Sequence, residues 1–354
     1  MKKFAFVFSL FIFCRPNLPA QAIIENPEKP LAKNAGRVLK LQEIWRITDE
    51  GGQFYFKYPG QLKIAEDGTI FMDDWEQFLE FSPAGKFIKN IFKKGEGPGE
   101  VQREFSYDIQ QNEIYVKDLN SGRLFRTNFD GSLLAQLPIR GSLYDDFCGV
   151  NKDSLVLIKC AWPPLEERTG KLMDVLYAVY LVSKDGKTEK NVYTFPVKRF
   201  LAPGAAMSWA GFESILSSNG RSLFVSHTRE YLIEVLDLEN CQITLRFSRM
   251  YQRIKHIKQS WEDDFRKKTN APAIEFDEDI RSLFLNEERL WVRTSTSDRE
   301  KGDLFDVFDS KGRFIDSFYV GLGRILLNAQ RGIIFVLEKS RAENYLLIKY
   351  KIME

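Results

Sequence analysis

From Gln61 onward the sequence repeats one pattern of short strands and tight turns, and this repeat constrains the fold more than any other feature. Each unit starts with an alternating strand, a polar turn and a β-branched or aromatic strand, and two further strands then surround a second turn. Four-stranded units of about 40 to 50 residues that repeat in this way are typical of a β-propeller. The first turn of the unit occurs six times, so we expect six antiparallel blades: Asp67-Gly68, Gln111-Asn112, Lys152-Asp153, Asn219-Gly220, Glu287-Glu288 and Arg331-Gly332.

The second turn of the unit occurs only five times, and this difference predicts how the ring closes. The sixth unit ends with the strand Tyr345 to Ile352 and has no chain left for an outermost strand. The segment Val38 to Ile47 is an unassigned strand that precedes the first full unit. We predict that this segment pairs with the last sheet, because a closed ring leaves no exposed sheet edges at the seam.

Composition supports an all-β globular chain and excludes some partners. Hydrophobic residues make up 44% of the 354 residues and charged residues 28%, which is the balance of a soluble domain. The 29 phenylalanines recur inside the short alternating segments, where aromatic rings fill the space between sheets. A net charge of +2 gives no field that would attract nucleic acid.

The first residues have the pattern of a secretory signal peptide. Lys2 and Lys3 precede an apolar run from Phe4 to Phe13, and a stretch ending in Ala20-Gln21-Ala22 follows. We therefore assign 1–22 to a signal peptide, 23–36 to a linker and 37–354 to the propeller. The apolar run is too short to span a bilayer, so we expect an exported, periplasmic or extracellular protein without a transmembrane span.

The cysteines leave one alternative open and suggest free thiols. A lipid anchor on Cys14 is less favoured, because Phe13 stands where lipoprotein cleavage sites have a small residue. Cleavage after Ala22 leaves Cys148, Cys160 and Cys241, which is an odd number. We expect these to be buried free thiols.

One insertion breaks the repeat between the fourth and fifth units. Residues 252–270 carry Ile254, Ile257, Trp261 and Phe265 at spacings of three and four, which predicts a short amphipathic helix. The favoured interpretation is a helix that lies over the rim of the propeller. The alternative is a helix that covers the ligand face or meets a partner.

A family resemblance covers nearly all of the mature chain. The segment Lys93-Lys94-Gly95-Glu96-Gly97-Pro98-Gly99-Glu100 resembles the Gly-x-Gly-Pro-Gly-Glu loop of bacterial exported six-bladed propellers related to the NHL-repeat and TolB-like propellers. The segment Asn112 to Asp118, with Asn120 and Arg123 after it, resembles a blade of the same kind, as does Arg289 to Val292. The resemblance implies a six-bladed fold and, for most members, no established activity.

Loops on one face are the first candidates for ligand binding. In an antiparallel blade, the loops between second and third strands emerge on the same face as the connections between blades. Loops on a rigid scaffold commonly carry binding residues. We therefore predict a loop face that binds a protein, peptide or glycan through Asp73, Asp74, Trp75, Asp118, Asn120, Trp162, His227 and Arg229.

A calcium site is the alternative candidate. Acidic residues occur where innermost strands begin, and hard cations take six or more oxygen ligands. Convergence of these residues at the channel mouth would give a metal-dependent hydrolase of the lactonase type. The residues concerned are Asp108, Asp146, Glu213 and Asp279.

Catalytic motifs are otherwise missing from the sequence. It contains two histidines, His227 and His256, and no Gly-x-Ser-x-Gly nucleophile motif. The glycine-rich loop lacks the Gly-Lys-Ser/Thr of a phosphate-binding loop. We therefore favour a monomeric binding or scaffolding module over an enzyme, with calcium as the one cofactor considered.

Overall fold

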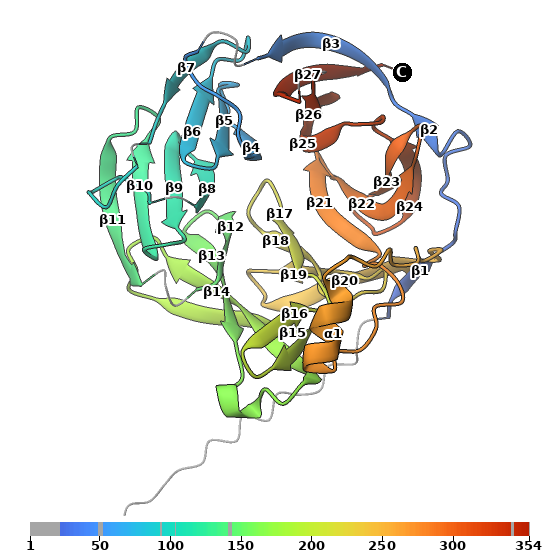
Figure 1. The fold of residues 1–354 in the computed structure, drawn as a ribbon. Coiled ribbons are helices and arrows are strands. Elements are labelled where there is room, and N and C mark those ends of the chain that lie inside the picture. The colour runs from blue at the N-terminus through green and yellow to red at the C-terminus, as the bar shows by residue number, and fades with distance from the viewer. Residues whose placement is uncertain are drawn as a thin grey trace, which may run out of the picture.

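The computed structural model describes residues 22–48, 52–92, 94–102, 104–140, 144–340 and 343–353. Cys14 and all of the predicted signal peptide except Ala22 lie outside these ranges. The described strands form six sheets arranged in a ring around a central axis (Figure 1). This arrangement confirms the predicted six-bladed β-propeller.

Blades 1 and 2 are four-stranded antiparallel sheets in which chain order equals spatial order. In both blades the first strand lies innermost and the fourth outermost (Figure 1). Blade 1 contains β4 (Pro59–Ile64), β5 (Ile70–Asp74), β6 (Gln77–Phe81) and β7 (Phe87–Asn90). Blade 2 contains β8 (Phe105–Gln110), β9 (Glu113–Asp118), β10 (Arg123–Asn128) and β11 (Leu133–Arg140).

Blade 3 is larger than blades 1 and 2. A short 3-10 helix (Leu165–Glu167) lies in the loop between two long strands, β13 and β14, and a fifth strand is added at the outer edge. Its strands are β12 (Asp146–Val150), β13 (Ser154–Ala161), β14 (Lys171–Ser183), β15 (Glu189–Ala202) and β16 (Ala205–Ser208).

Blades 4, 5 and 6 each receive an outer strand from the N-terminal segment of the chain. Blade 4 contains β17 (Glu213–Leu216), β18 (Ser222–Ser226), β19 (Ile233–Asp237), β20 (Gln242–Arg249) and β1 (Ile24–Asn26). Blade 5 contains β21 (Ile280–Asn286), β22 (Arg289–Asp298), β23 (Gly302–Phe308), β24 (Phe314–Tyr319) and β2 (Arg37–Val38). Blade 6 contains β25 (Ile325–Gln330), β26 (Ile333–Lys339), β27 (Tyr345–Met353) and β3 (Lys40–Ile47).

The N-terminal segment closes the ring as predicted. β3 pairs antiparallel with β27, with Trp45 opposite Lys349 and Leu41 opposite Ile352. Residues 23–36, which the sequence suggested were a linker, contribute β1, which pairs in parallel with β20. The short strand β2 that follows pairs in parallel with β24. We call residues 23–47 the N-terminal strap, because they run along the outer edges of three blades (Figure 1).

Trp45 of the strap joins the last blade to the first. Its indole Nε1 donates a hydrogen bond to the carbonyl oxygen of Pro83 in blade 1, at 3.2 Å. Its ring also lies against Gly85, where an added Cβ would come within 2.9 Å of the indole. The ring therefore closes through side-chain packing as well as through strand pairing.

The core consists of apolar layers between neighbouring blades. Between blades 1 and 2, Phe78 packs against Tyr107 with ring centroids 4.5 Å apart, and Phe71 and Phe105 complete the same layer. Every residue of β6 and of β19 is buried, because these inner strands pack against neighbouring blades on both faces of their sheets. This packing accounts for the high phenylalanine content seen in the sequence.

The insertion forms a shorter helix than the spacing of its apolar residues suggested. Helix α1 spans Glu262–Thr269 and ends at Asn270, whose left-handed φ of 60° terminates it. Ile254 and Ile257 lie before the helix, because residues 254–256 instead pair with 275–277 through backbone hydrogen bonds.

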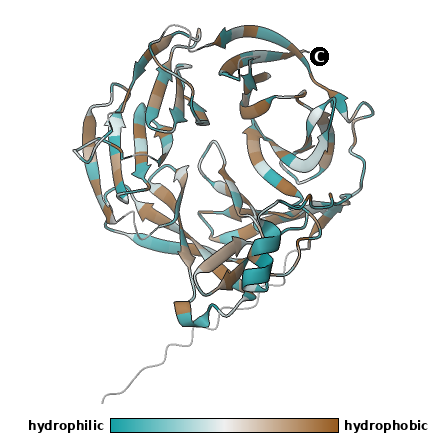
Figure 2. Cartoon of the chain, in the orientation of Figure 1, coloured by the Kyte–Doolittle hydropathy of each residue, from teal (hydrophilic) through white to brown (hydrophobic). Residues whose placement is uncertain are grey.

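The position of α1 supports the favoured interpretation of a helix over the rim. Phe265 of the helix contacts Phe200 of β15 with ring centroids 6.2 Å apart, while most of α1 is hydrophilic (Figure 2). Within the described ranges, no helix is both long and apolar enough to cross a bilayer.

Candidate functional site

Two of the predicted loop-face residues, Asp74 and Asp118, are fully buried and hold loops in place. Asp74 accepts hydrogen bonds from the backbone N–H groups of Lys57 and Tyr58. Asp118 accepts hydrogen bonds from the Ser121 hydroxyl at 2.6 Å and from Arg123 at 3.2 Å. Both carboxylates therefore accept hydrogen bonds from groups inside the protein.

Arg123 also explains the glycine-rich loop that carries the family resemblance. Its guanidinium donates to the carbonyl oxygens of Glu96, Gly97 and Glu100 at 2.7 to 2.9 Å. The backbone N–H of Gly97 donates to the Glu100 carboxylate at 2.8 Å. This loop is a structural turn that is anchored on blade 2.

His227 and Arg229 are likewise engaged in internal contacts. His227 is only 9% exposed, and its ring nitrogens lie 3.0 Å from the Pro196 carbonyl oxygen and 3.0 Å from the Glu234 carboxylate. Arg229 donates to the carbonyl oxygens of Trp209 and Phe276. Both side chains are therefore held by partners within the protein.

The other four predicted residues differ in their accessibility. Trp75 packs against Tyr58, with centroids 4.9 Å apart, and Trp162 is 42% exposed beside Arg168. Asn120 is exposed. The Asp73 carboxylate lies in the wall of blade 1 against Gly60, where burial raises its pKa to about 7. The eight residues therefore do not form one binding surface.

Two of the four proposed calcium ligands form ion pairs with basic side chains instead of meeting one another. Asp108 forms an ion pair with Lys63 at 2.5 Å, and Asp279 forms one with Arg253 at 3.0 Å. Among the residues that the structure describes, no three His, Cys, Asp or Glu side chains are close enough to hold a metal ion. The calcium hypothesis and the lactonase alternative therefore find no ligand group in this part of the chain.

A polar pocket of about 730 Å³ occupies the central channel. It lies toward the ends of the six innermost strands, β4, β8, β12, β17, β21 and β25, and the turns that follow β4, β8 and β17 add to its wall. It therefore lies nearer the face opposite the predicted loop face. Its polar lining includes Gln61, Lys63, Glu66, Asp108, Gln110, Gln111, Asn112, Ser214, Ser217, Ser218, Asn328 and Gln330.

Some of these polar groups are fixed and others are free to meet a ligand. Lys63 and Asp108 neutralise each other, and Asn328 donates to the carbonyl oxygen of Leu62 at 3.2 Å. The side-chain amides of Gln61 and Gln330 form no hydrogen bond with any other described residue. The pocket thus combines a rigid wall with unused amide donors and acceptors.

Sequence reasoning did not identify this pocket, although it placed the innermost strands correctly. Polar residues that follow those strands, such as Gln111 and Asn112, are interpreted from the sequence only as turn residues. The available signal was the repeated occurrence of amide and hydroxyl side chains at equivalent positions of several blades. That signal has meaning only once the blades are known to surround a common axis.

Cys148 lies in the wall of the central pocket, and its thiol has low reactivity. Its Sγ lies 3.4 Å from the hydroxyl oxygen of Ser214, and burial raises the pKa of the thiol to about 12. A thiol with such a pKa is a poor nucleophile at neutral pH. Cys148, Cys160 and Cys241 are all free thiols, as expected, but each residue is partly exposed rather than fully buried.

Several carboxylates lie where the innermost strands begin. This end of the channel is opposite the turns that line the central pocket. Burial and the nearby carboxylates of Glu278 and Asp146 together raise the pKa of Glu213 to about 7, while Arg293 opposes the rise. A carboxyl group with such a perturbed pKa is held at an energetic cost to the fold.

We expect the substitution Glu213→Gln to stabilise the protein at pH 8 and to have a smaller effect at pH 5. The folded-state pKa lies above the ordinary value of 4.5, so the cost is present above pH 7 and is lost as the pH falls toward 4.5. The gain at pH 8 should exceed the gain at pH 5 by about 1 to 3 kcal/mol, measured by urea unfolding. Glu288→Gln, in an exposed turn, is the control, and an equal gain at both pH values would contradict the prediction.

The closed ring of six sheets and the polar pocket in its channel define a six-bladed β-propeller with a central pocket. Residues 49–200 match the model of the DUF5128 family, described as a six-bladed beta-propeller. No curated protein matches the chain. The naming of the propeller as NHL-repeat or TolB-like stays a prediction.

Solved structures share the fold at low sequence identity. A DUF4221 family member from Bacteroides vulgatus is 14% identical with a TM-score of 0.56, covering 90% of this chain and 99% of that one. A protein from Bacteroides fragilis that is described as exported is 11% identical with a TM-score of 0.52, covering 94% and 100%. A gluconolactonase from Xanthomonas campestris is 12% identical with a TM-score of 0.46, covering 94% and 99%. The likenesses to the two Bacteroides proteins concern the fold alone.

Proposed function

We propose that the protein is an exported binding module that takes a hydroxyl-rich ligand, the end of a glycan chain, into its central pocket. The observation that carries this proposal is the pocket of about 730 Å³, to which all six innermost strands contribute. Pockets of about 300 to 1,000 Å³ are the usual size for small ligands or the end of a larger one.

The chemistry of the lining favours a glycan over a charged ligand. Side-chain amides and hydroxyls both donate and accept hydrogen bonds, as sugar hydroxyls do. The charge of Lys63 is balanced by Asp108 at 2.5 Å, so the wall offers no unpaired cation at that position. Phe129 and Phe284 add apolar surface on which the face of a sugar ring can pack.

The internal contacts of the predicted loop-face residues support the central pocket as the binding site. Asp74, Asp118, His227 and Arg229 hold the scaffold, so a protein or peptide partner would find few free polar groups among them. Export to the periplasm or the cell exterior rests on the signal-peptide pattern and on the likeness to a protein described as exported. The module is proposed to act as a monomer.

Glycan-array binding followed by calorimetry tests the proposal. We expect the protein to bind a restricted set of oligosaccharides, and the double variant Gln61→Leu/Gln330→Leu to bind them at least tenfold more weakly. Gln42→Leu makes the same change at an exposed position of β3 and should leave affinity unchanged. Binding of no glycan, or equal affinity in the double variant and the wild type, would refute the proposal.

A further inference from the structure

The insertion between blades 4 and 5 is attached to blade 3 through helix α1, which is drawn in front of β15 and β16 in Figure 1. Phe265 of α1 packs against a small apolar cluster of Phe200, Ala202 and Ala271. The helix has only eight residues, and isolated helices of fewer than about 12 residues are marginal in water. The position of α1 therefore depends on the contacts that hold it in place.

A histidine between two carboxylates fixes the start of this helix. Nδ1 of His256 lies 2.6 Å from the carboxylate of Asp277, and Nε2 lies 2.7 Å from that of Glu262. Glu262 is the first residue of α1, is only 6% exposed and also accepts a hydrogen bond from the backbone N–H of Gln259. We call His256, Asp277 and Glu262 the His256 cluster. It joins the helix to the segments before and after it, which pair with each other through their backbones.

The geometry of the His256 cluster fits the protonated imidazole ring. An imidazolium ion has an N–H donor on each nitrogen, whereas the neutral ring has one donor and one acceptor. Both partners of His256 are carboxylate oxygens, which only accept hydrogen bonds when they are ionised. Loss of the proton therefore places a nitrogen lone pair against a carboxylate oxygen, and that contact becomes repulsive.

The surroundings of His256 favour its protonated form. The hydrogen bond with Asp277 raises the pKa of His256 above its ordinary value of 6.5; burial opposes this rise and the carboxylate of Glu262 adds to it. Arg281 of β21 binds the second oxygen of Asp277 at 2.9 Å. The other charged side chains on residues 253–263 and 275–281 are Arg253, Lys255, Lys258, Asp263, Glu275, Glu278 and Asp279.

The direction of the pH dependence follows from the raised pKa of His256. The stabilisation by the cluster is fully present below the ordinary value of 6.5, and it is lost as the pH rises through the higher pKa of the folded state. The cluster joins α1 to its own flanking segments and not to another blade. The expected change is therefore a local opening of the insertion within an intact propeller.

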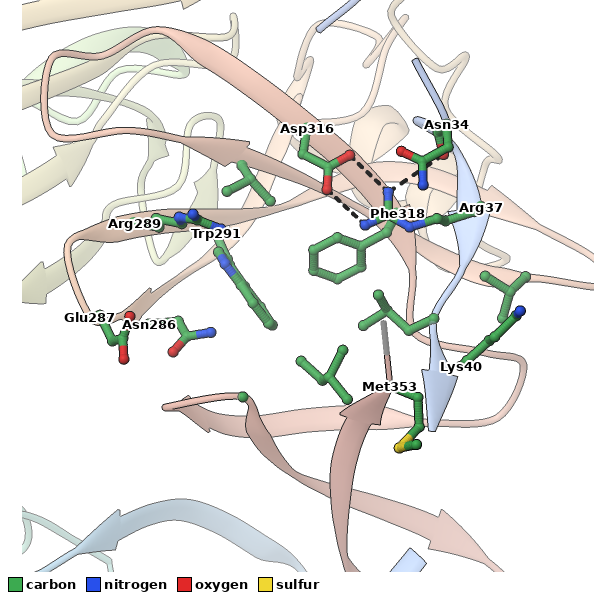
Figure 3. A pocket seen from close by; sticks show the side chains of 15 residues that line it. Asn34, Arg37, Lys40, Asn286, Glu287, Arg289, Trp291, Asp316, Phe318 and Met353 are labelled. Carbon is green, nitrogen blue, oxygen red and sulfur yellow. Dashed lines mark hydrogen bonds and ion pairs between the residues drawn. The ribbon is translucent and has the colours of Figure 1, made fainter. Parts of the chain in front are cut away.

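An arginine ion pair at the N-terminal strap provides a comparison. Arg37 of β2 donates two 2.8 Å hydrogen bonds to Asp316 of β24, in the wall of a cavity of about 700 Å³ between blades 5 and 6 (Figure 3). An arginine keeps its charge at neutral and alkaline pH. The strap is therefore held in the range in which the attachment of α1 weakens, because the cation beside α1 is an imidazolium ion.

We propose that the His256 cluster is a pH-sensitive switch, which holds α1 on blade 3 while the imidazole is protonated and releases the helix as the proton is lost. Release uncovers Phe200 and Ala202 of β15, which are 0% and 3% exposed in the structure. An apolar surface at the rim of blade 3 is therefore more accessible at alkaline pH than at mildly acidic pH.

Amide hydrogen exchange of the full chain at pH 6 and pH 8.5 tests the proposal, with each rate divided by the intrinsic rate at the same pH. Residues 37–39 of the strap are the internal reference. Relative to them, we expect the opening constant of residues 262–271 to be at least about threefold larger at pH 8.5 than at pH 6. In His256→Gln this ratio should be the same at both pH values, because glutamine does not titrate.

A second variant tests the role of the carboxylates. Asp277→Asn removes one partner of His256, so the midpoint of the opening should move to lower pH than in the wild type. Asp264→Asn makes the same change at an exposed position of α1 and should leave the midpoint unchanged. The proposal is overturned if α1 opens equally at both pH values, if His256→Gln keeps the pH dependence, or if Asp277→Asn does not move the midpoint.

Discussion

Deletion of residues 23–47 is expected to abolish cooperative folding of the isolated chain. The deletion removes β3, whose backbone pairs with β27 over most of its length, and exposes the outer edge of blade 6. It also removes Leu39 and Ile47, which are 8% and 5% exposed, and burial of each contributes about 1.5 to 3 kcal/mol. Because β1 and β2 are lost from blades 4 and 5 as well, the effect exceeds the stability margin of an ordinary domain.

Circular dichroism and thermal melting of the deleted protein provide the measurement, and a peptide provides the control. A synthetic peptide of residues 37–48 added in trans should restore a cooperative melt, because it supplies β2 and β3. Deletion of 23–30 alone removes β1 and should cost much less. A protein lacking 23–47 that melts at the wild-type temperature would contradict this prediction.

The substitution Arg249→Met is expected to destabilise the protein by about 3 to 5 kcal/mol at pH 8, because it leaves a buried carboxylate without its partner. Arg249 of β20 donates to Asp306 of β23 at 2.6 Å, and the two side chains are only 6% and 0% exposed. The Tyr231 hydroxyl donates to the same carboxylate oxygen at 2.8 Å. This ion pair joins blades 4 and 5 in the interior.

The pH dependence of this effect has a definite sign. Burial raises the pKa of Asp306 from its ordinary value of 3.8 to about 6 even with Arg249 present, and removal of the cation should raise it further. The penalty in Arg249→Met is therefore fully present above the folded-state pKa, and it decreases as the pH falls and the carboxyl group takes up a proton. Urea unfolding at pH 8 and pH 5 measures the difference.

Two further variants control for the loss of an arginine side chain. Arg313→Met breaks an ion pair with Asp309 in which the arginine side chain is 60% exposed, and it should cost at most about 1 kcal/mol. The double variant Arg249→Met/Asp306→Leu removes both buried charges and should recover much of the lost stability. If Arg249→Met costs no more than Arg313→Met, the buried pair does not have the proposed role.

The location of function was harder to predict than the fold. The sequence placed Asp74 and Asp118 at loops that follow second strands, and the structure has them there. The partners of Asp74, Lys57 and Tyr58, lie in the segment before blade 1, which a linear pattern does not reveal. The partners of Asp118, Ser121 and Arg123, lie in the turn that follows Asp118 itself. A carboxylate in a loop looks the same in sequence whether it meets solvent or closes a turn.

The helical insertion shows a similar limit. The spacing of Ile254, Ile257, Trp261 and Phe265 is compatible with one continuous helix, yet only residues 262–269 form it. The backbone of residues 254–256 finds partners in residues 275–277, and this pairing competes with helix formation. Periodicity describes which faces are apolar, but it does not say which backbone partner is available.

The sequence by itself determined the six-bladed ring and the return of the chain's beginning to its last blade. Turn residues and alternating strands are local signals, and an unequal number of turns requires a strand from elsewhere. Only the tertiary structure showed that β1 of the strap pairs with blade 4. It alone also showed the central pocket and the cavity between blades 5 and 6. These features depend on side chains far apart in the sequence that meet only when the sheets pack, and no local pattern encodes such meetings.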